Sequence, residues 1–364
     1  MGLNAPMDSL PLWTLALLFV AAAAVVWVAG IQLSKTTDVL DDRLKIGSAF
    51  GGLLVLAVAT NLPEIAITVS AAATGNLDVA VGNILGGIAL QTVVIVLLDV
   101  FGRRGRGVHP LTYRAASMVL VLEAVTVVAV LTVVMAGTQL PSDLVALRLT
   151  PDVVLIALLW VVGLVLVRRA STNLPWQAQG ISPGATPHEP GHRRRRPQAP
   201  HKQRSTPAVV AAFTVSALAT LGAGIVLERA GSAAADQLGL SGVLFGATVL
   251  ALATALPELS TGLQAIRQGD DNLALSDIFG GNAFLPVLFL VATVISGEAV
   301  LPEAGTADIY LTALAALLTL VYVVGIVMRP TRRILGMGVD SFVVLALYAA
   351  GVAGLFAITG AGSG

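Results

Sequence analysis

Long apolar runs alternate with short polar stretches along almost the whole chain of 364 residues. Each run is apolar all round and about 20 residues long, which is the length of a helix that crosses a lipid bilayer. Without water inside the bilayer, runs of this length satisfy their backbone as helices. The first apolar run is expected to end at Gly30, before a polar linker. Ten membrane spans are predicted near 11–31, 47–70, 77–99, 114–136, 152–168, 207–227, 241–265, 273–296, 308–328 and 338–359.

The composition supports this assignment. Charged residues make up 12 % of the chain and hydrophobic residues 56 %, whereas a soluble domain carries roughly 25 % charged residues. A soluble protein is therefore excluded. The chain has no cysteine, so disulfide bonds, thiolate metal sites and cysteine nucleophiles are excluded as well.

The basic residues are distributed unevenly about the predicted spans. The net charge is zero, with 21 Lys and Arg against 21 Asp and Glu. If the connections alternate between the two sides of a membrane, 19 of the 21 basic residues lie on one side, and only Arg148 and Arg229 lie on the other. Because cytoplasmic connections retain Lys and Arg, we expect both termini outside and the central loop in the cytoplasm.

The central loop, residues 170–206, is the longest polar segment. Its Pro, Gly, His and Arg content cannot bury enough apolar surface to become ordered. It is predicted to be a basic, disordered cytosolic linker between two five-helix halves, residues 1–169 and 207–364. The run Arg193–Arg196 has two interpretations, a contact with anionic lipid or a regulator and a simple topology anchor, and the pattern favours the anchor.

The chain also contains an internal repeat. At a constant offset of 194 residues it matches itself without a gap, with 16 identities over the 40 residues from 52 to 91. A shared Thr-x-Leu-Pro-Glu followed by an amide or acid and Gly-Gly is too specific for chance similarity between apolar segments. The matching segments are Ala-Val-Ala-Thr-Asn-Leu-Pro-Glu at 57–64 with Ala-Leu-Ala-Thr-Ala-Leu-Pro-Glu at 251–258, and Asn-Ile-Leu-Gly-Gly at 83–87 with Asp-Ile-Phe-Gly-Gly at 277–281.

The two repeats, about 46–100 and about 240–296, occupy the second and third and the seventh and eighth predicted spans. Five spans separate them, so equivalent segments cross the membrane in opposite directions. Inverted repeats are typical of secondary transporters, which build the substrate site near the midplane where breaks in the two halves meet. The predicted fold class is an all-α membrane protein of ten transmembrane helices arranged as two inverted five-helix repeats.

Each repeat places a glutamate inside an apolar run, Glu64 in the first and Glu258 in the second. An ionisable side chain at the centre of a membrane costs at least about 2.5 kcal/mol, so it needs a partner or a function. Each glutamate follows a proline, which removes a backbone donor and frees the carbonyl four residues earlier, at Ala59 or Ala253. Two buried acids without buried basic partners predict a cation site.

Further oxygen-bearing side chains accompany the two glutamates. Thr60 and Thr254 lie four residues before them on the same helical face, and Asn83 and Asp277 come from the neighbouring helix, where Gly-Gly permits close helix approach. Carboxylate, hydroxyl and carbonyl oxygens are the ligands that Ca²⁺ prefers. The predicted cation ligands are Thr60, Glu64, Asn83, Thr254, Glu258 and Asp277, with Asn61, Asn282, Glu123, Ala59 and Ala253 as accessory residues.

At these residues the chain resembles the sodium/calcium exchanger family of the cation/calcium antiporter superfamily, and more closely its prokaryotic members. In that family each repeat carries a Gly-Thr-Ser-x-Pro-Glu element and a Gly-Asn/Asp-x-x-Gly-Ser-Asn element, between which the ions bind. The resemblance implies the six ligands above and alternating access, with one Ca²⁺ exchanged against several Na⁺ or H⁺.

The chain departs from the family pattern at several positions. Asn61 and Ala255 replace the serine after the threonine, and Ile88 replaces the final asparagine of the first repeat, whereas Asn282 keeps it in the second. The loss of a hydroxyl associated with Na⁺ leaves both Na⁺ and H⁺ open as the coupling ion, because a buried carboxylate can bind either a proton or a metal cation.

Glu123 lies inside the fourth span without a counterpart in the ninth. It has two interpretations, a proton relay or gate, and a residue hydrogen-bonded to a neighbouring helix.

Other classes of function lack their motifs. The chain contains no H-E-x-x-H, no G-x-S-x-G and no nucleotide-binding P-loop, so neither an enzyme nor a nucleotide-driven pump is expected. A cation channel would share buried oxygen ligands but would not couple two fluxes. We expect no cofactor, no nucleic acid and no obligatory protein partner, only the lipid bilayer and inorganic cations, in a prokaryotic plasma membrane.

Overall fold

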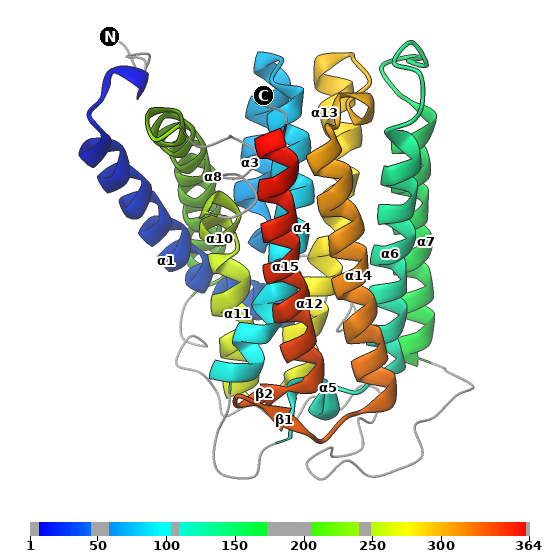
Figure 1. The fold of residues 1–364 in the computed structure, drawn as a ribbon. Coiled ribbons are helices and arrows are strands. Elements are labelled where there is room, and N and C mark those ends of the chain that lie inside the picture. The colour runs from blue at the N-terminus through cyan, green and yellow to red at the C-terminus, as the bar shows by residue number, and fades with distance from the viewer. Residues whose placement is uncertain (1–6, 45–57, 103–108, 173–204, 240–248, 362–364) are drawn as a thin grey trace.

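The computed structural model describes residues 7–44, 58–102, 109–172, 205–239 and 249–361, which form one helical bundle (Figure 1). The helices are α1 (Leu12–Leu44), α3 (Leu62–Thr74), α4 (Leu77–Phe101), α5 (Leu111–Arg114), α6 (Met118–Gly137), α7 (Pro151–Thr172), α8 (Thr206–Gln237), α10 (Ala251–Thr254), α11 (Leu256–Arg267), α12 (Asp271–Phe284), α13 (Leu288–Ser296), α14 (Thr306–Met328) and α15 (Val339–Ala361). Short 3-10 helices are η1 (Met7–Ser9), η4 (Leu285–Val287) and η5 (Leu301–Glu303).

The described residues include eight segments long and apolar enough to cross a membrane. α12 and α13 count as one of these, although Pro286 and the 3-10 turn of η4 interrupt the helix between them. The predicted spans at 47–70 and 241–265 lie partly outside the described residues, and what is described of them is shorter, as α3, α10 and α11. The count of ten spans therefore stays a prediction.

The expectation of a purely helical chain needs one correction. Strands β1 (Arg333–Ile334) and β2 (Met337–Gly338) pair antiparallel, with Arg333 opposite Gly338. The two residues between them, Leu335 and Gly336, both have positive φ, as a tight two-residue hairpin requires. The protein is nearly all-helical, with this hairpin joining α14 to α15.

Helix α4 lies in the centre of the bundle (Figure 1) and is the most buried of the long helices. It packs against α3, α10, α11, α12, α14 and α15. Helices α1 and α8 lie side by side on one flank, where Val26 and Leu227 belong to a small apolar core of their own. Helices α6 and α7 form the opposite flank, so α4 can present side chains from the protein interior to several neighbours at once.

The first segment apolar enough to cross a membrane is Leu12–Leu33, which ends near the predicted Gly30. The polar linker predicted after Gly30 is wrong, because α1 continues as a helix to Leu44. The residues after Gly30 are polar enough to look like a linker, yet Leu33 and Leu40 are buried seven positions apart on one face. Thr36 also satisfies its hydroxyl locally, donating to the Gln32 carbonyl at 2.7 Å. The linker predicted at 170–206 falls almost wholly outside the described residues.

Two glycines explain part of the repeat. Gly75, between α3 and α4, has φ of 79°, and Gly269, between α11 and α12, has φ of 83°. In both turns the following residue donates back into the preceding helix, from Asn76 N to Ala71 O at 2.9 Å and from Asp270 N to Ala265 O at 3.0 Å. This left-handed helix ending favours glycine, so the match at these positions reflects the same turn built twice.

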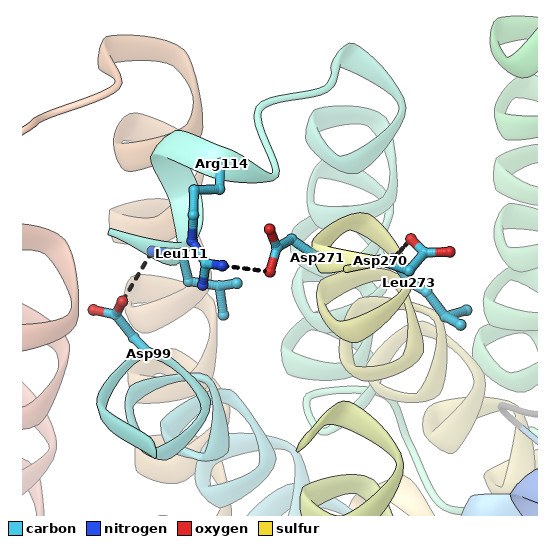
Figure 2. Close-up of polar contacts among 6 residues, drawn as sticks. All are labelled: Asp99, Leu111, Arg114, Asp270, Asp271 and Leu273. Atoms are coloured by element: carbon cyan, nitrogen blue, oxygen red, sulfur yellow. Dashed lines mark hydrogen bonds and ion pairs between the residues drawn. The ribbon is translucent and has the colours of Figure 1, made fainter. Parts of the chain in front are cut away.

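At the end of the bundle that carries α5 and the hairpin, Arg114 and Asp271 form an ion pair with 2.9 Å between Nη1 and Oδ1 (Figure 2). Asp270 caps α12 by accepting a hydrogen bond from Leu273 N at 3.0 Å. These contacts fix the start of α12 against α5. They also place the first residues of α12 beside the connection that leads into α6.

Candidate ion-binding site

The two repeated Pro-Glu segments form helix breaks at equivalent places. Thr254 ends α10, and Ala255 separates it from α11. In the first repeat Asn61 interrupts the helix before α3 begins at Leu62. Proline follows each break in the first turn, where its missing N–H leaves a hydrogen bond of the preceding helix unmade. The predicted interruptions are thus present in the structure.

Each break places its glutamate in the first turn of the helix that follows. Glu64 in α3 and Glu258 in α11 have side chains with 0 % exposure. Both carboxylates lie near a helix N-terminus, whose partial positive charge favours an anion. Among the described residues no Lys, Arg or His forms an ion pair with either glutamate. The ion pair found among those residues joins Arg114 to Asp271, at the end of the bundle that carries α5.

The threonines of the two breaks are exchanged between the repeats. Thr254 of the second repeat lies in hydrogen-bonding contact with Glu64 of the first. Thr60 of the first repeat makes the corresponding contact with Glu258 of the second. Each carboxylate is therefore positioned by both repeats, and the two breaks form a single site.

Gln91, which is not among the predicted ligands, lies between the two glutamates. The Nε2 atom of Gln91, on α4, is 3.2 Å from Asn61 Oδ1, 3.4 Å from Glu64 Oε1 and 3.5 Å from Glu258 Oε1. The two carboxylates thus face each other across one amide nitrogen. In the sequence, Gln91 could have been found as a polar residue inside an apolar run, and in the structure it is fully buried. The repeat did not reveal it, because Leu285 occupies the equivalent position of the second repeat.

Several buried oxygens around this amide make no hydrogen bond with described residues. They are Glu64 Oε2, Glu258 Oε2, Gln91 Oε1 and Asn282 Oδ1. Buried acceptors without donors are costly unless a cation or a donor satisfies them. The described part of the chain has no group of three or more His, Cys, Asp or Glu side chains placed to hold a metal ion. The set consists instead of two carboxylates with amide and hydroxyl oxygens, a mixture that fits Ca²⁺ or Na⁺.

The Gly-Gly segment of the second repeat brings α12 close to the site. A Cβ on Gly281 would lie 2.8 Å from Asn61 Nδ2, so a larger residue there would require the Asn61 side chain to shift. The next residue, Asn282, donates to Thr92 Oγ1 on α4 at 3.1 Å. In the first repeat a Cβ on Gly87 would meet open space. The expected close approach is therefore found in one repeat and not in the other.

The third predicted ligand pair is Asn83 and Asp277, and the described interactions join only Asp277 to a glutamate. Asp277 is buried and accepts a hydrogen bond from Thr261 Oγ1 at 2.5 Å, and it interacts electrostatically with Glu258. Asn83 is also buried, but no described contact joins it to the glutamates. It precedes Gln91 by eight residues on α4, which is about 12 Å along a helix. Asp277 therefore adjoins the site, and Asn83 stays a predicted ligand.

The prolines also provide the surface on which the flanking helices pack. A Cβ on Gly30 of α1 would lie 3.0 Å from Pro257 Cα, and a Cβ on Gly224 of α8 would lie 3.1 Å from Pro63 Cα. Gly30 and Gly224 are 194 residues apart, so this match extends beyond the repeats identified from the sequence. Each flanking helix contacts the break of the opposite repeat.

Glu123 on α6 lies outside the cluster formed by the glutamates and Gln91. Both of its carboxylate oxygens are 2.7 Å from Ser276 Oγ on α12, and its side chain is 8 % exposed. This contact matches the interpretation of a residue hydrogen-bonded to a neighbouring helix. Ser276 directly precedes Asp277, so Glu123 also fixes the segment of α12 that borders the site.

We expect Glu123→Gln to leave the protein as stable as the parent, because an amide still bonds Ser276. Glu123→Leu is expected to destabilise the fold by about 1 to 3 kcal/mol, because it leaves the Ser276 hydroxyl buried without that partner. Thermal unfolding of the two variants in detergent measures the difference. Equal melting temperatures for both variants would contradict a structural role for the contact.

A site built from broken helices inside a bundle of apolar helices is typical of membrane transport proteins. A family model described as "Sodium/calcium exchanger protein" matches residues 14–177 and 208–357. The chain belongs to this family of membrane antiporters.

Two sequence relatives are bacterial. A protein named "Putative antiporter CaxA" from Alkalimonas amylolytica is 29 % identical over 277 residues, which cover 76 % of this chain and 79 % of the relative. "Inner membrane protein YrbG" from Escherichia coli (strain K12) is 26 % identical over 291 residues, which cover 78 % of this chain and 80 % of the relative.

Solved structures share the fold at lower identity. The sodium-calcium exchanger NCX_Mj superposes with a TM-score of 0.59 and 16 % identity, covering 94 % of this chain and 99 % of that chain. The H⁺/Ca²⁺ exchanger CAX superposes with a TM-score of 0.61 and 12 % identity, covering 94 % and 87 %. At these identities the comparison establishes the fold and leaves the coupling ion open.

Proposed function

We propose that this protein exchanges Ca²⁺ against Na⁺ or H⁺ by alternating access at the site between Glu64 and Glu258. The observation that carries the proposal is the placement of two buried carboxylates, one from each repeat, across the single amide nitrogen of Gln91. A divalent cation bound there would neutralise both charges. The cation ligands in this proposal are the glutamates, Thr60 and Thr254, with Asp277 at the edge and Asn83 as a predicted ligand.

The side-chain amide of Gln91 can offer the site either a hydrogen-bond donor or an oxygen ligand. In the structure its amide nitrogen points toward the glutamates, and its oxygen makes no hydrogen bond with described residues. A rotation of the amide by 180° exchanges the donor for an oxygen ligand. The nitrogen would then partly compensate the carboxylates without a cation, and the oxygen would coordinate a bound one. Such a group lowers the barrier between loaded and unloaded forms.

Obligatory exchange follows from the same charges. A cluster of carboxylates without a bound cation or protons cannot cross a low-dielectric barrier cheaply. The transporter therefore changes orientation only when Ca²⁺ or its counter-ions occupy the oxygens. The inverted repeats, in this proposal, supply equivalent breaks for the outward-open and inward-open states, and the exchanged threonine contacts between the repeats support it.

The placement of basic residues supports the orientation that we propose. Both termini lie at one end of the bundle, and α5 and the hairpin lie at the other (Figure 1). Arg114 ends α5, and Arg333 begins the hairpin. Because basic residues stay on the cytoplasmic side, the termini would face outward and the central linker the cytoplasm, in a prokaryotic plasma membrane.

The coupling ion is decided by a flux experiment. Proteoliposomes loaded with Ca²⁺ are diluted into media with an inward Na⁺, K⁺ or H⁺ gradient, or with none, and Ca²⁺ efflux is recorded. We expect efflux with Na⁺ or H⁺ and none without a counter-ion gradient. Efflux without any counter-ion would contradict exchange and indicate a channel, while Na⁺ flux driven by a proton gradient without Ca²⁺ flux would indicate a Na⁺/H⁺ exchanger of the same fold.

A further inference from the structure

A second pair of buried acids lies at the end of the bundle that carries α5 and the hairpin. Asp99, near the end of α4, is 1 % exposed, and Asp340, in the first turn of α15, is 5 % exposed. Gly338 lies between them. Its backbone N–H donates to Asp99 Oδ2 at 2.6 Å, and a Cβ on Gly338 would contact Asp340 Oδ1 and lie 3.3 Å from Asp99 Oδ2. The two carboxylates therefore flank one small volume.

The two aspartates are held differently. Asp99 also accepts a hydrogen bond from Leu111 N of α5 at 2.9 Å, and Figure 2 shows this carboxylate directed at that backbone. Neither carboxylate oxygen of Asp340 makes a well-aligned hydrogen bond with the described residues, and the donors that lie close to it are the Thr112 hydroxyl and the Ser341 backbone. Asp340 can approach α14 closely because Gly325 has no side chain there. A buried carboxylate with such weak donors is costly unless a cation or a proton compensates it.

Hydroxyl groups from three elements surround the same volume. Tyr322 of α14 has 0 % exposure, and its hydroxyl lies close to Ser341, Asp340 and Asp99. Thr112 of α5 lies beside Asp340. The hydroxyl oxygens of Tyr322 and Thr112 are buried and make no well-aligned hydrogen bond with described residues, although Tyr322 lies close to Ser341 and Thr112 lies close to Asp340. Hydroxyl oxygens from separate parts of the chain thus lie beside the pair of acids.

Arginines at this end of the bundle contact other groups. Arg333, which pairs with Gly338 in the hairpin, donates to Gly336 O at 3.1 Å. Arg114 pairs with Asp271 on the far side of α5 from Asp99 (Figure 2). The Arg329 guanidinium carbon lies 4.6 Å from the centre of the Tyr113 ring, and this arginine donates to Tyr113 O at 3.3 Å. Among the described residues Asp340 has no ion pair. Its negative charge therefore needs a mobile counter-charge.

We propose that Asp99 and Asp340, with the hydroxyls of Tyr322, Thr112 and Ser341, form a second cation site that binds a hard divalent cation, Ca²⁺ or Mg²⁺. Two carboxylates with hydroxyl oxygens are the ligand chemistry of these ions. The site is separate from the transport site, because Asp99 follows Gln91 by eight residues on α4, about 12 Å along the helix.

A cation at this site would join α4, α5, α14 and α15 at one point. Because α4 also carries Gln91, occupancy would hold the central helix against the two peripheral helices and stabilise the folded state according to the ion concentration. The role is regulatory or structural rather than transport. It holds whether or not the exchange proposed above is correct.

Terbium luminescence tests the site, because Tb³⁺ replaces Ca²⁺ and is sensitised by a nearby tyrosine. The measurement uses the full chain in detergent with Glu64→Gln and Glu258→Gln, so that the transport carboxylates are absent. We expect Tb³⁺ emission that Ca²⁺ or Mg²⁺ competes away. Asp340→Asn and Tyr322→Phe are each expected to abolish it, whereas Asp152→Asn, which changes an equally buried first-turn aspartate of α7, leaves it unchanged.

Absence of emission in the transport-site variant, or emission unaffected by Asp340→Asn, would overturn the proposal. If Asp340→Asn does not fold, Thr112→Val is used, and it is expected to weaken Tb³⁺ binding. A cation-dependent rise in melting temperature, measured with Ca²⁺ and Mg²⁺ separately, identifies the preferred ion. Ca²⁺ flux in proteoliposomes is recorded independently, so failure of the second site and failure of the exchange function give different results.

Discussion

Glu64→Gln and Glu258→Gln are each expected to abolish Ca²⁺ exchange while leaving the protein folded. Each replacement keeps the shape of the side chain but removes one of the two negative charges that face Gln91. Loss of one partner from a buried charge interaction costs about 3 to 5 kcal/mol, which corresponds to more than about a hundredfold in affinity. Ca²⁺ efflux from proteoliposomes under the effective counter-ion gradient measures the result.

The matched control is Glu303→Gln, because Glu303 lies in an exposed connection between α13 and α14. It should transport Ca²⁺ at the parental rate. Thermal unfolding shows whether each variant is folded, and Glu64→Asp adds a test of position, since it keeps the charge but shortens the side chain. Parental flux in both Glu64→Gln and Glu258→Gln would refute the assignment of the site.

Gln91→Leu is expected to raise the Ca²⁺ concentration needed for half-maximal flux by about tenfold to a hundredfold. The amide oxygen would coordinate the bound cation, and a polar contact with a charged group contributes about 1.5 to 3 kcal/mol. This loss is expected to exceed the opposite effect of removing the amide donor, which faces both glutamates without a cation. Leucine removes the donor and the oxygen ligand at similar volume, and it reproduces the residue found at the equivalent position, Leu285. Initial rates of Ca²⁺ uptake over a range of concentrations measure the change.

Gln91→Asn provides the comparison, because it keeps the amide but draws it back by one methylene group. We expect its affinity to fall between the parent and Gln91→Leu. If Gln91→Leu transports with parental affinity, the amide is only a packing group, and the proposed exchange of its nitrogen and oxygen during the cycle is wrong. The glutamate variants would still test the rest of the site.

Much of the fold follows from local sequence. The membrane class, the helix breaks at Pro63 and Pro257 and the paired glutamates were all predictable, because an all-round apolar run, a proline and a buried acid each have one dominant physical consequence in a bilayer. The extension of α1 beyond Gly30 was not. The low hydropathy of the residues after Gly30 predicts a linker. Whether Leu33 and Leu40 are buried depends instead on the helices that pack against them, which hydropathy does not show.

The site residues likewise fall into those that the sequence predicts and those that only the structure reveals. Repetition identified residues that occur twice, and so it found Thr60, Glu64, Thr254 and Glu258. It also favoured Asn83, which the described contacts do not join to the glutamates, and it passed over Gln91, whose equivalent is leucine. Repetition reveals only residues that occur in both halves, and Gln91 lies where the two halves differ.

The sequence by itself determined that this protein resides in a membrane, that two similar segments carry its acids, and that those acids lack basic partners within the apolar runs. These properties depend on composition and on residues close together in the chain. Only the tertiary structure decided that threonines of one repeat contact glutamates of the other, that Gln91 lies between them, and that Asp99 meets Asp340 at Gly338. Each of these contacts joins residues distant in sequence, and their proximity arises from helix packing, which no local pattern encodes.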